Sequence, residues 1–160
     1  MRKSCEEVIV EFDDLAELIF NEIIPKLEGN VGISVFARER AKFEGWLKVE
    51  LCESLLKHFQ DVIPERNRID ITFDDRAIEL KTVNTNYRYS NVENKTRPIT
   101  MNIQGVIKDI NKLKATNYAN KAILLVVFPA KHDHKDWQIH LQKIQEHVLK
   151  IDRKEFMFRY

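Results

Sequence analysis

The chain has 160 residues, of which 44% are hydrophobic and 32% are charged, and these proportions are typical of one globular domain. Its two cysteines and four glycines exclude a disulfide framework, a cysteine-only zinc site, a glycine-rich dinucleotide fingerprint and a P-loop. The sequence begins without the apolar core of a signal peptide, and no apolar run approaches the roughly 18 residues of a membrane span. We therefore expect a cytoplasmic protein that does not contact a membrane.

The net charge of +1 conceals an uneven distribution. Residues 61–160 hold 18 basic and 13 acidic side chains, and residues 81–121 hold 8 basic and 2 acidic ones, a net charge of +6 for that stretch. Clustered Lys and Arg favour a polyanionic partner such as nucleic acid. A solvated charged face would have the same composition, so charge alone does not decide between them.

The first part of the chain predicts two helices. Apolar residues recur at helical spacing over 12–28, and we expect Pro25 to end or kink that helix. The two glycines in 28–35 indicate a loop. A wide apolar stripe then predicts a second helix over 37–59.

The pattern next changes to the period of a strand. Residues 61–65 predict a short edge strand that contains Pro64, and residues 68–73 and 77–83 alternate apolar and polar side chains. Asp74-Asp75 between the last two predicts a hairpin turn.

The remaining elements alternate in type. Residues 84–101 predict a long loop, 102–117 a helix, 122–128 a buried strand, 135–150 a helix and 156–160 an edge strand. Together with the earlier elements they predict a single α/β domain over residues 1–160, with a mixed central sheet flanked by helices.

The hairpin is the part of the sequence that indicates chemistry. If the turn centres on Asp74-Asp75, Ile71 lies opposite Ile78 on one face, and Asp70 lies opposite Glu79 on the other. Cβ atoms of such a pair are about 5 Å apart, so the two carboxylates repel each other unless a cation compensates. A divalent ion with oxygen ligands is the natural compensation.

The same register adds positive charge to the pair. Lys81 points to the face of Asp70 and Glu79, and Arg68 lies opposite Lys81. A carboxylate pair, a metal position and a lysine are the groups needed for metal-assisted phosphodiester hydrolysis. The competing interpretation is a solvent-exposed hairpin face without function.

These residues resemble a known signature. Ile69-Asp70, followed after eight residues by Glu79-Leu80-Lys81, is similar to the D-x(n)-(D/E)-x-K motif of the PD-(D/E)XK nuclease superfamily. The Pro that often precedes the Asp is replaced here by Ile69, at a position that varies in the superfamily. The resemblance implies that Asp70, Glu79 and the Leu80 carbonyl bind Mg²⁺ or Mn²⁺, and that Lys81 is the catalytic lysine.

The resemblance extends to the order of the elements. Residues of about 37–130 resemble the restriction endonuclease-like αβββαβ core, with an N-terminal helix and a C-terminal helix and strand as additions. The superfamily often adds a carboxylate from the first core helix, for which Glu50 is our choice and Glu44 and Glu39 are alternatives. Gln104 resembles the polar residue that many members place near the site.

The loop after the lysine strand is a candidate nucleic-acid contact. Tyr87 and Arg88 could stack on bases or contact phosphate, and Lys95 and Arg97 add positive charge. A surface loop without function is the alternative interpretation.

We therefore expect an enzyme, a Mg²⁺-dependent nuclease that hydrolyses DNA phosphodiester bonds. The alternative is a non-catalytic nucleic-acid-binding or assembly subunit on the same fold, and a third possibility is a metal-dependent hydrolase of nucleotides. The sequence leaves open the structure of the substrate and whether the chain forms a homodimer or joins a partner subunit.

Overall fold

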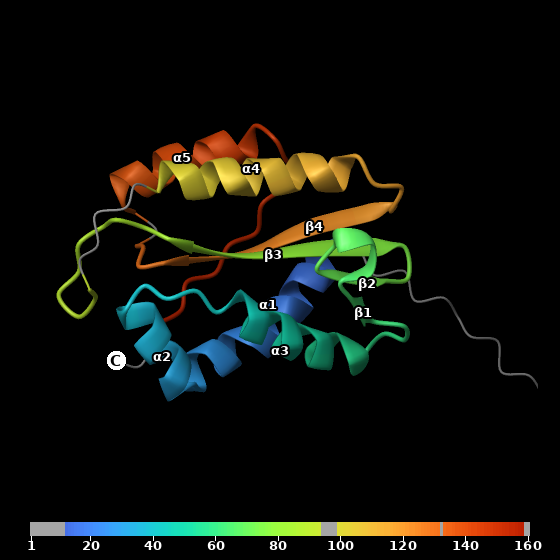
Figure 1. Ribbon diagram of the computed structural model, residues 1–160, viewed down its shortest axis with the longest axis horizontal. Helices are drawn as coiled ribbons and strands as arrows, with labels where there is room; N and C mark the ends of the chain where they lie inside the picture. The colour runs from blue at the N-terminus through green and yellow to red at the C-terminus, as the bar shows by residue number, and fades with distance from the viewer. Residues whose placement is uncertain (1–11, 94–98, 132, 159–160) are drawn as a thin grey trace, which may run out of the picture.

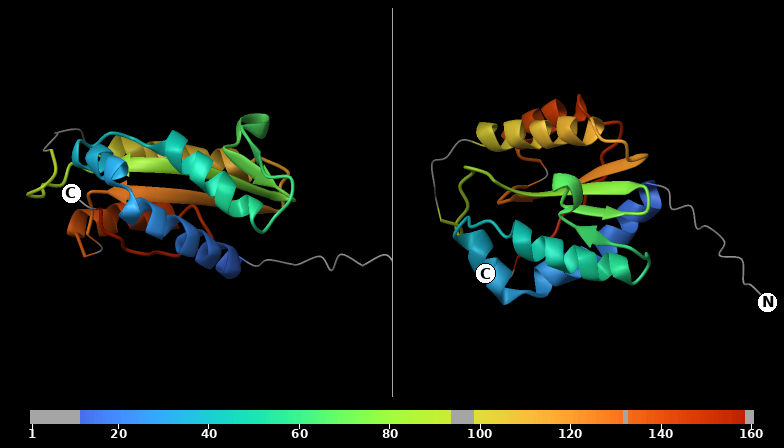
Figure 2. Two further views of the ribbon diagram at one scale, coloured as in Figure 1. Left: turned by 90° about the horizontal axis from the view of Figure 1, so that it is seen from below. Right: turned by 45° about the vertical axis from the view of Figure 1, so that its right-hand side comes forward.

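The computed structural model describes residues 12–93, 99–131 and 133–158, which form three layers (Figure 1). Among the described residues, a four-stranded mixed sheet forms the central layer. Three helices cover one face of this sheet, and two helices cover its other face. Figure 2 shows the same layering from two further directions. The expected α/β architecture with a mixed central sheet is confirmed.

The first face is covered by α1 (Phe12–Gly29), α2 (Val31–Arg38) and α3 (Glu44–Leu56). Helix α1 agrees with the prediction, but it continues through Pro25 for another turn instead of ending there. The expected helix over 37–59 is shorter, since its first residues belong to α2 or to the segment that precedes α3.

The prediction of a loop over 28–35 is wrong, because α2 occupies most of these residues. The Asn30 side chain accepts a hydrogen bond from the Ile33 N–H at 3.0 Å and so caps the first turn of α2. A capping Asn therefore outweighs the two glycines that suggested a loop.

The sheet follows chain order, β1 (Ile63–Pro64), β2 (Ile71–Phe73), β3 (Arg76–Asn84) and β4 (Asn120–Phe128). The first two pairings are antiparallel, and β3 and β4 are parallel. Ile71 pairs with Ile78, so the register predicted for the hairpin is confirmed.

The strand expected over 68–73 is correct only in its second half. Residues Arg66–Arg68 form a 3-10 turn, in which Asn67 and Arg68 have φ of 54° and 62°. This left-handed backbone conformation is uncommon in residues other than glycine, and it is incompatible with the extended conformation of a strand at Arg68. Arg68 therefore does not pair with Lys81, contrary to the expectation.

The second face is covered by α4 (Thr100–Lys114), which connects β3 to β4, and by α5 (Lys135–Gln145). Strand β4 is an edge strand of the described sheet, and most of its apolar side chains are half-buried rather than covered on both faces as expected. Helix α5 is shorter than the predicted 135–150.

The expected edge strand at 156–160 is not formed by its described part, residues 156–158, which lack strand pairing. Phe158 instead packs its ring against Phe43 and Phe128. This segment therefore joins the apolar core between the sheet and the first three helices.

Buried apolar side chains fill both spaces between the layers. Leu47 and Leu51 of α3 meet Leu80 of β3 on the first face, and Ile103 and Val106 of α4 belong to the core of the second face. Because the β3 side chains alternate, Leu80 enters the first core while Glu79 and Lys81 point toward α4. The sheet thus fixes on which side of β3 the candidate site lies.

Arg40, in the segment between α2 and α3, is a buried arginine with φ of 55°. Its guanidinium donates hydrogen bonds to the main-chain carbonyls of Thr85, Tyr87 and Glu93. One side chain therefore fixes the start and the far end of the segment that follows β3.

Within the described residues, none of the helices combines the length and the apolar character that crossing a membrane requires.

Candidate active site

The centre of the candidate site is the carboxyl pair of Asp70 and Glu79. Asp70 directly precedes β2 and Glu79 lies in β3, so the hairpin register brings the two side chains together across the strands, where they share a hydrogen bond. Asp70 Oδ2 also accepts the Leu80 N–H at 2.8 Å. The expected opposition of these two acids is therefore present in the structure.

The two carboxyls differ in their protonation. Burial, followed by the hydrogen bond with Asp70, raises the pKa of Glu79 to about 7 from an ordinary 4.5. Burial opposes ionisation of Asp70 as well, but hydrogen bonds from Glu79, Lys48 and the Leu80 N–H hold the pKa of Asp70 below its ordinary value. Below about pH 7 the pair therefore carries roughly one negative charge, with the proton mainly on Glu79.

Two lysines from opposite layers contact the pair. The Lys48 Nζ of α3 lies 2.7 Å from Asp70 Oδ1, and the Lys112 Nζ of α4 contacts Glu79 Oε1. Neither lysine was expected from the sequence. Each carboxyl is thus contacted by an ammonium from a different face of the sheet.

Lys81 lies two residues after Glu79 and points to the same face of β3. Its Nζ is 2.5 Å from Asp109 Oδ2 of α4, and the Lys81 side chain packs over Gly105, where an added Cβ would lie 3.4 Å from Lys81 Cε. Asp109 is a further residue that the sequence did not indicate. The structure therefore brings together the three residues of the predicted motif and adds a carboxylate that holds the lysine.

The donor set fits a divalent cation with oxygen ligands. Asp70 and Glu79 supply two carboxyls, and the Leu80 carbonyl faces the same strand edge as the Leu80 N–H that binds Asp70. In the part of the chain that the structure describes, no group of three or more His, Cys, Asp or Glu side chains could hold a metal ion. The ion would therefore depend on two carboxyls, the carbonyl and water.

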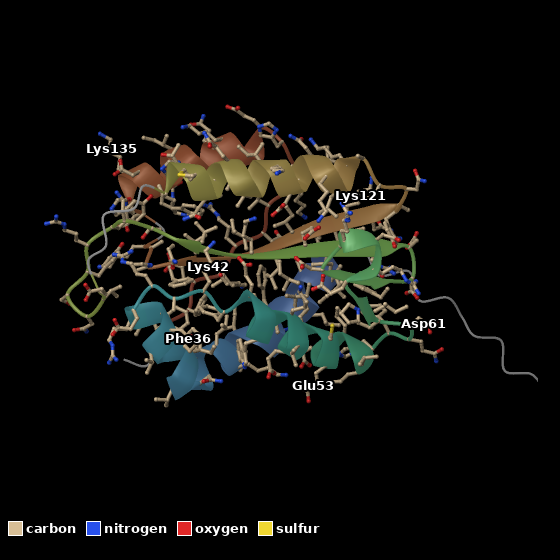
Figure 3. All side chains as sticks on the ribbon, viewed as in Figure 1. Phe36, Lys42, Glu53, Asp61, Lys121 and Lys135 are labelled. Atoms are coloured by element: carbon tan, nitrogen blue, oxygen red, sulfur yellow. The ribbon has the colours of Figure 1, made fainter. Side chains whose placement is uncertain are left out.

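Glu50 does not join this site. Its Oε2 lies 2.7 Å from Lys26 Nζ of α1, and the same lysine contacts Glu53, which lies on the outer side of α3 (Figure 3). Because residues two apart on a helix are rotated by roughly 200°, Lys48 points to Asp70 while Glu50 points to α1. The choice of Glu50 as the helix carboxylate is therefore not supported by its position.

The two alternatives to Glu50 also have other partners. Glu44 Oε1 accepts hydrogen bonds from the Thr82 N–H at 2.8 Å and from the Thr82 hydroxyl, so it joins α3 to β3 just beyond Lys81. Glu39 forms an ion pair with its neighbour Arg38 on the surface. Glu44 therefore contacts the strand that carries Glu79 and Lys81.

The residues expected to contact nucleic acid are mostly exposed or outside the described part of the chain, and Tyr87 is the exception. Arg68, Arg88 and Gln104 are exposed. Lys95 and Arg97 lie outside the described residues.

Tyr87 is buried, and its ring stacks on His134 with the centroids 3.7 Å apart. The prediction that Tyr87 stacks on a base is therefore wrong, because its ring already forms part of the core beneath α5. Burial, with the nearby Asp136 carboxylate, also raises the pKa of Tyr87 to about 12.

Comparisons of the chain with models of protein families, with curated proteins and with solved structures find no match.

Proposed function

We propose that the protein is a Mg²⁺- or Mn²⁺-dependent nuclease that hydrolyses phosphodiester bonds of DNA. The single observation that supports this best is the pair formed by Asp70 and Glu79, with Lys81 on the same face of β3. Two carboxyls at this separation resist simultaneous ionisation, and a divalent cation would remove that cost.

Each residue of the pair and its neighbours would have a defined task. Asp70, Glu79 and the Leu80 carbonyl would hold the ion, which supplies polarisation of the phosphate and a lower pKa for water. Lys81, held by Asp109, would orient the attacking water. Hydrolysis adds water across the ester: its oxygen bonds to phosphorus, one P–O bond breaks, and the released sugar oxygen takes up a proton.

The order of elements also supports a place near the PD-(D/E)XK superfamily. From α3 to β4 the chain runs helix, three strands, helix and strand, the order of the restriction endonuclease-like αβββαβ core. Asp70 precedes the second of these strands, and Glu79 and Lys81 lie in the third. We propose this fold for residues of about 37–130.

A polyanionic substrate agrees with the charge around the pair. Exposed Arg66 and Arg68 lie in the turn just before Asp70, and Lys108 is exposed on α4. Cations placed around a buried acidic pair suit a phosphate backbone better than a small neutral substrate.

The test is a cleavage assay with the purified chain, supercoiled and linear DNA, and Mg²⁺ or Mn²⁺. We expect nicking that EDTA, Asp70→Asn and Lys81→Ala each abolish. Asp14→Asn and Lys135→Ala, at exposed positions on α1 and α5, are the matched controls and retain activity. Cleavage that persists in Asp70→Asn and Lys81→Ala contradicts the proposal, and hydrolysis of free nucleotides in place of DNA indicates a nucleotide hydrolase.

A non-catalytic nucleic-acid-binding or assembly subunit is the second candidate. The observation that favours it is that Asp70, Glu79 and Lys81 already have protein partners, in Lys48, Lys112 and Asp109. This function predicts DNA binding that weakens with salt and is equal in EDTA and in Mg²⁺. Cleavage or a metal-dependent affinity decides against it.

A further inference from the structure

Lys48 and Lys112 reach the carboxyl pair from the two opposite layers of the molecule. Lys48 belongs to α3 and Lys112 to α4, so the sheet hairpin with Asp70 and Glu79 lies between the helices that carry them. An ammonium beside each carboxyl favours the ionised form, which burial disfavours.

These lysines also have second partners, and both partners lie in one turn. Lys48 Nζ contacts the Glu65 carboxylate, and Lys112 Nζ donates to the Arg68 carbonyl at 2.5 Å. The turn Glu65–Arg68 is separated from Asp70 by Ile69 alone and carries exposed Arg66. A lysine that leaves the carboxyl pair therefore has an acceptor at the border of the site.

The two lysines differ in how freely they can make this movement, since the side chain of Lys48 is only 21% exposed. The side chain of Lys112 is 41% exposed, while that of its partner Glu79 is only 6% exposed. The flexible four-carbon stem of a lysine lets the ammonium change partners without a change in the backbone.

We infer that Lys48 and Lys112 occupy the place of a divalent cation at Asp70 and Glu79, and become phosphate contacts of the site once that cation binds. This inference rests on the metal site of the proposed function. An ammonium and a divalent ion compete for the same carboxylate oxygens, so binding of one displaces the other. The displaced ammoniums, beside Arg66 and Arg68, then form a cationic border that fits the phosphates flanking the cleaved bond. The ligand class is a nucleic-acid strand with at least two phosphates.

The first experiment observes the wild-type chain and needs no variant that must fold. Side-chain ¹⁵N–¹H resonances of the lysine ammoniums are followed at low temperature while Mg²⁺ is added. We expect the Lys48 and Lys112 signals to shift or broaden through solvent exchange at the Mg²⁺ concentration that saturates the site. Lys26 is the internal control, because its 2.7 Å ion pair with Glu50 matches the 2.7 Å pair of Lys48 with Asp70 and lies away from the site.

The second experiment measures two affinities of Lys48→Met, Lys112→Met and the matched control Lys135→Met. Calorimetric titration with Mn²⁺ at pH 8 is expected to give about tenfold tighter binding for each site variant, since a competing charge a few ångströms away is removed. Binding of a non-cleavable phosphorothioate duplex is expected to weaken at least about fivefold in the presence of metal and to change little in EDTA. Lys135→Met changes neither affinity.

The outcomes separate this inference from the proposed function. Unchanged or weaker Mn²⁺ binding in Lys48→Met and Lys112→Met, with unmoved ammonium signals in the wild type, overturns the inference and leaves the nuclease proposal standing. Tighter Mn²⁺ binding and weaker duplex binding in the two variants, without cleavage of any DNA by the wild type, support the inference and contradict the nuclease proposal. No Mn²⁺ binding in the wild type or in either variant overturns both.

Discussion

The Lys81 ammonium donates to the Asp109 carboxylate across the space between β3 and α4, with 2.5 Å between Nζ and Oδ2. Both side chains are about four-fifths buried, so water screens the pair only weakly. The stem of the lysine passes Gly105, one turn earlier on α4. The Lys81 ammonium therefore depends for its direction on a helix outside the hairpin that carries it.

Asp109→Asn tests whether this contact positions Lys81. We expect kcat for DNA cleavage to fall about tenfold with little change in KM, because the amide holds the ammonium less firmly and the lysine loses its orientation. Mn²⁺ affinity, measured by calorimetry, stays at the wild-type value because Asp70 and Glu79 are intact. A cleavage rate that rises in Asp109→Asn would mean that Asp109 sequesters Lys81 from the reaction.

Glu79→Gln tests the raised pKa of Glu79 through stability. A carboxyl whose folded pKa is about 7 and whose ordinary value is 4.5 binds a proton more tightly in the folded state. Its contribution is fully present below about pH 4.5 and is lost as pH rises through about 7. The amide imitates the protonated carboxyl, so Glu79→Gln is expected to exceed the wild type in free energy of unfolding by up to about 3 kcal/mol at pH 8.

The measurement is urea unfolding of both proteins at pH 5 and pH 8 without divalent ions. At pH 5 the difference is expected to shrink to about 1 kcal/mol, because Glu79 is then mostly protonated in the folded wild type. Glu17→Gln, at an exposed position of α1, serves as the control and shows no such difference between the two pH values. A wild-type advantage at pH 8 would mean that the Lys112 ion pair outweighs the effect of burial.

Metal affinity is expected to depend on pH through the same carboxyl. A cation must displace the proton from Glu79, so the Mn²⁺ association constant rises by up to about tenfold per pH unit between pH 5 and 7 and levels off above that. Calorimetry at pH 6 in buffers of different ionisation enthalpy counts the released protons, and we expect about one per ion. A pH-independent affinity would exclude Glu79 as a ligand.

Glu50→Gln tests the helix carboxylate that the superfamily pattern suggested. Since Glu50 pairs with Lys26 and not with the Asp70–Glu79 pair, we expect unchanged Mn²⁺ affinity and cleavage rate. The free energy of unfolding is expected to fall by about 0.5–1 kcal/mol, as for a partly exposed ion pair. A large loss of cleavage with unchanged stability would place Glu50 in the site after all.

The hairpin could be predicted because its information is local. Alternation of period two sets which residues share a face, and Asp74-Asp75 sets the register, so the opposition of Asp70 and Glu79 follows from a few consecutive residues. The face of Lys81 follows for the same reason.

The helical contributions to the site could not be predicted in this way. Which of Glu50 and Lys48 faces the site depends on the rotation of α3 about its axis relative to the sheet, which the wide apolar stripe does not determine. Lys112 and Asp109 depend on how α4 packs over β3. The polar segment around Tyr87 predicts a surface residue, whereas the Tyr87 ring packs on His134.

The guanidinium of Arg40 joins parts of the molecule that are distant in the chain. It satisfies three main-chain acceptors between Thr85 and Glu93, although Arg40 itself follows α2. The segment that presents Arg88 to solvent is consequently tied to the helices beneath the sheet, and Tyr87 of the same segment also packs in the apolar core that contains Ile103 of α4. Without the Arg40 guanidinium, the Thr85, Tyr87 and Glu93 carbonyls would lose their donor, so a single substitution at Arg40 would loosen the segment that carries Arg88.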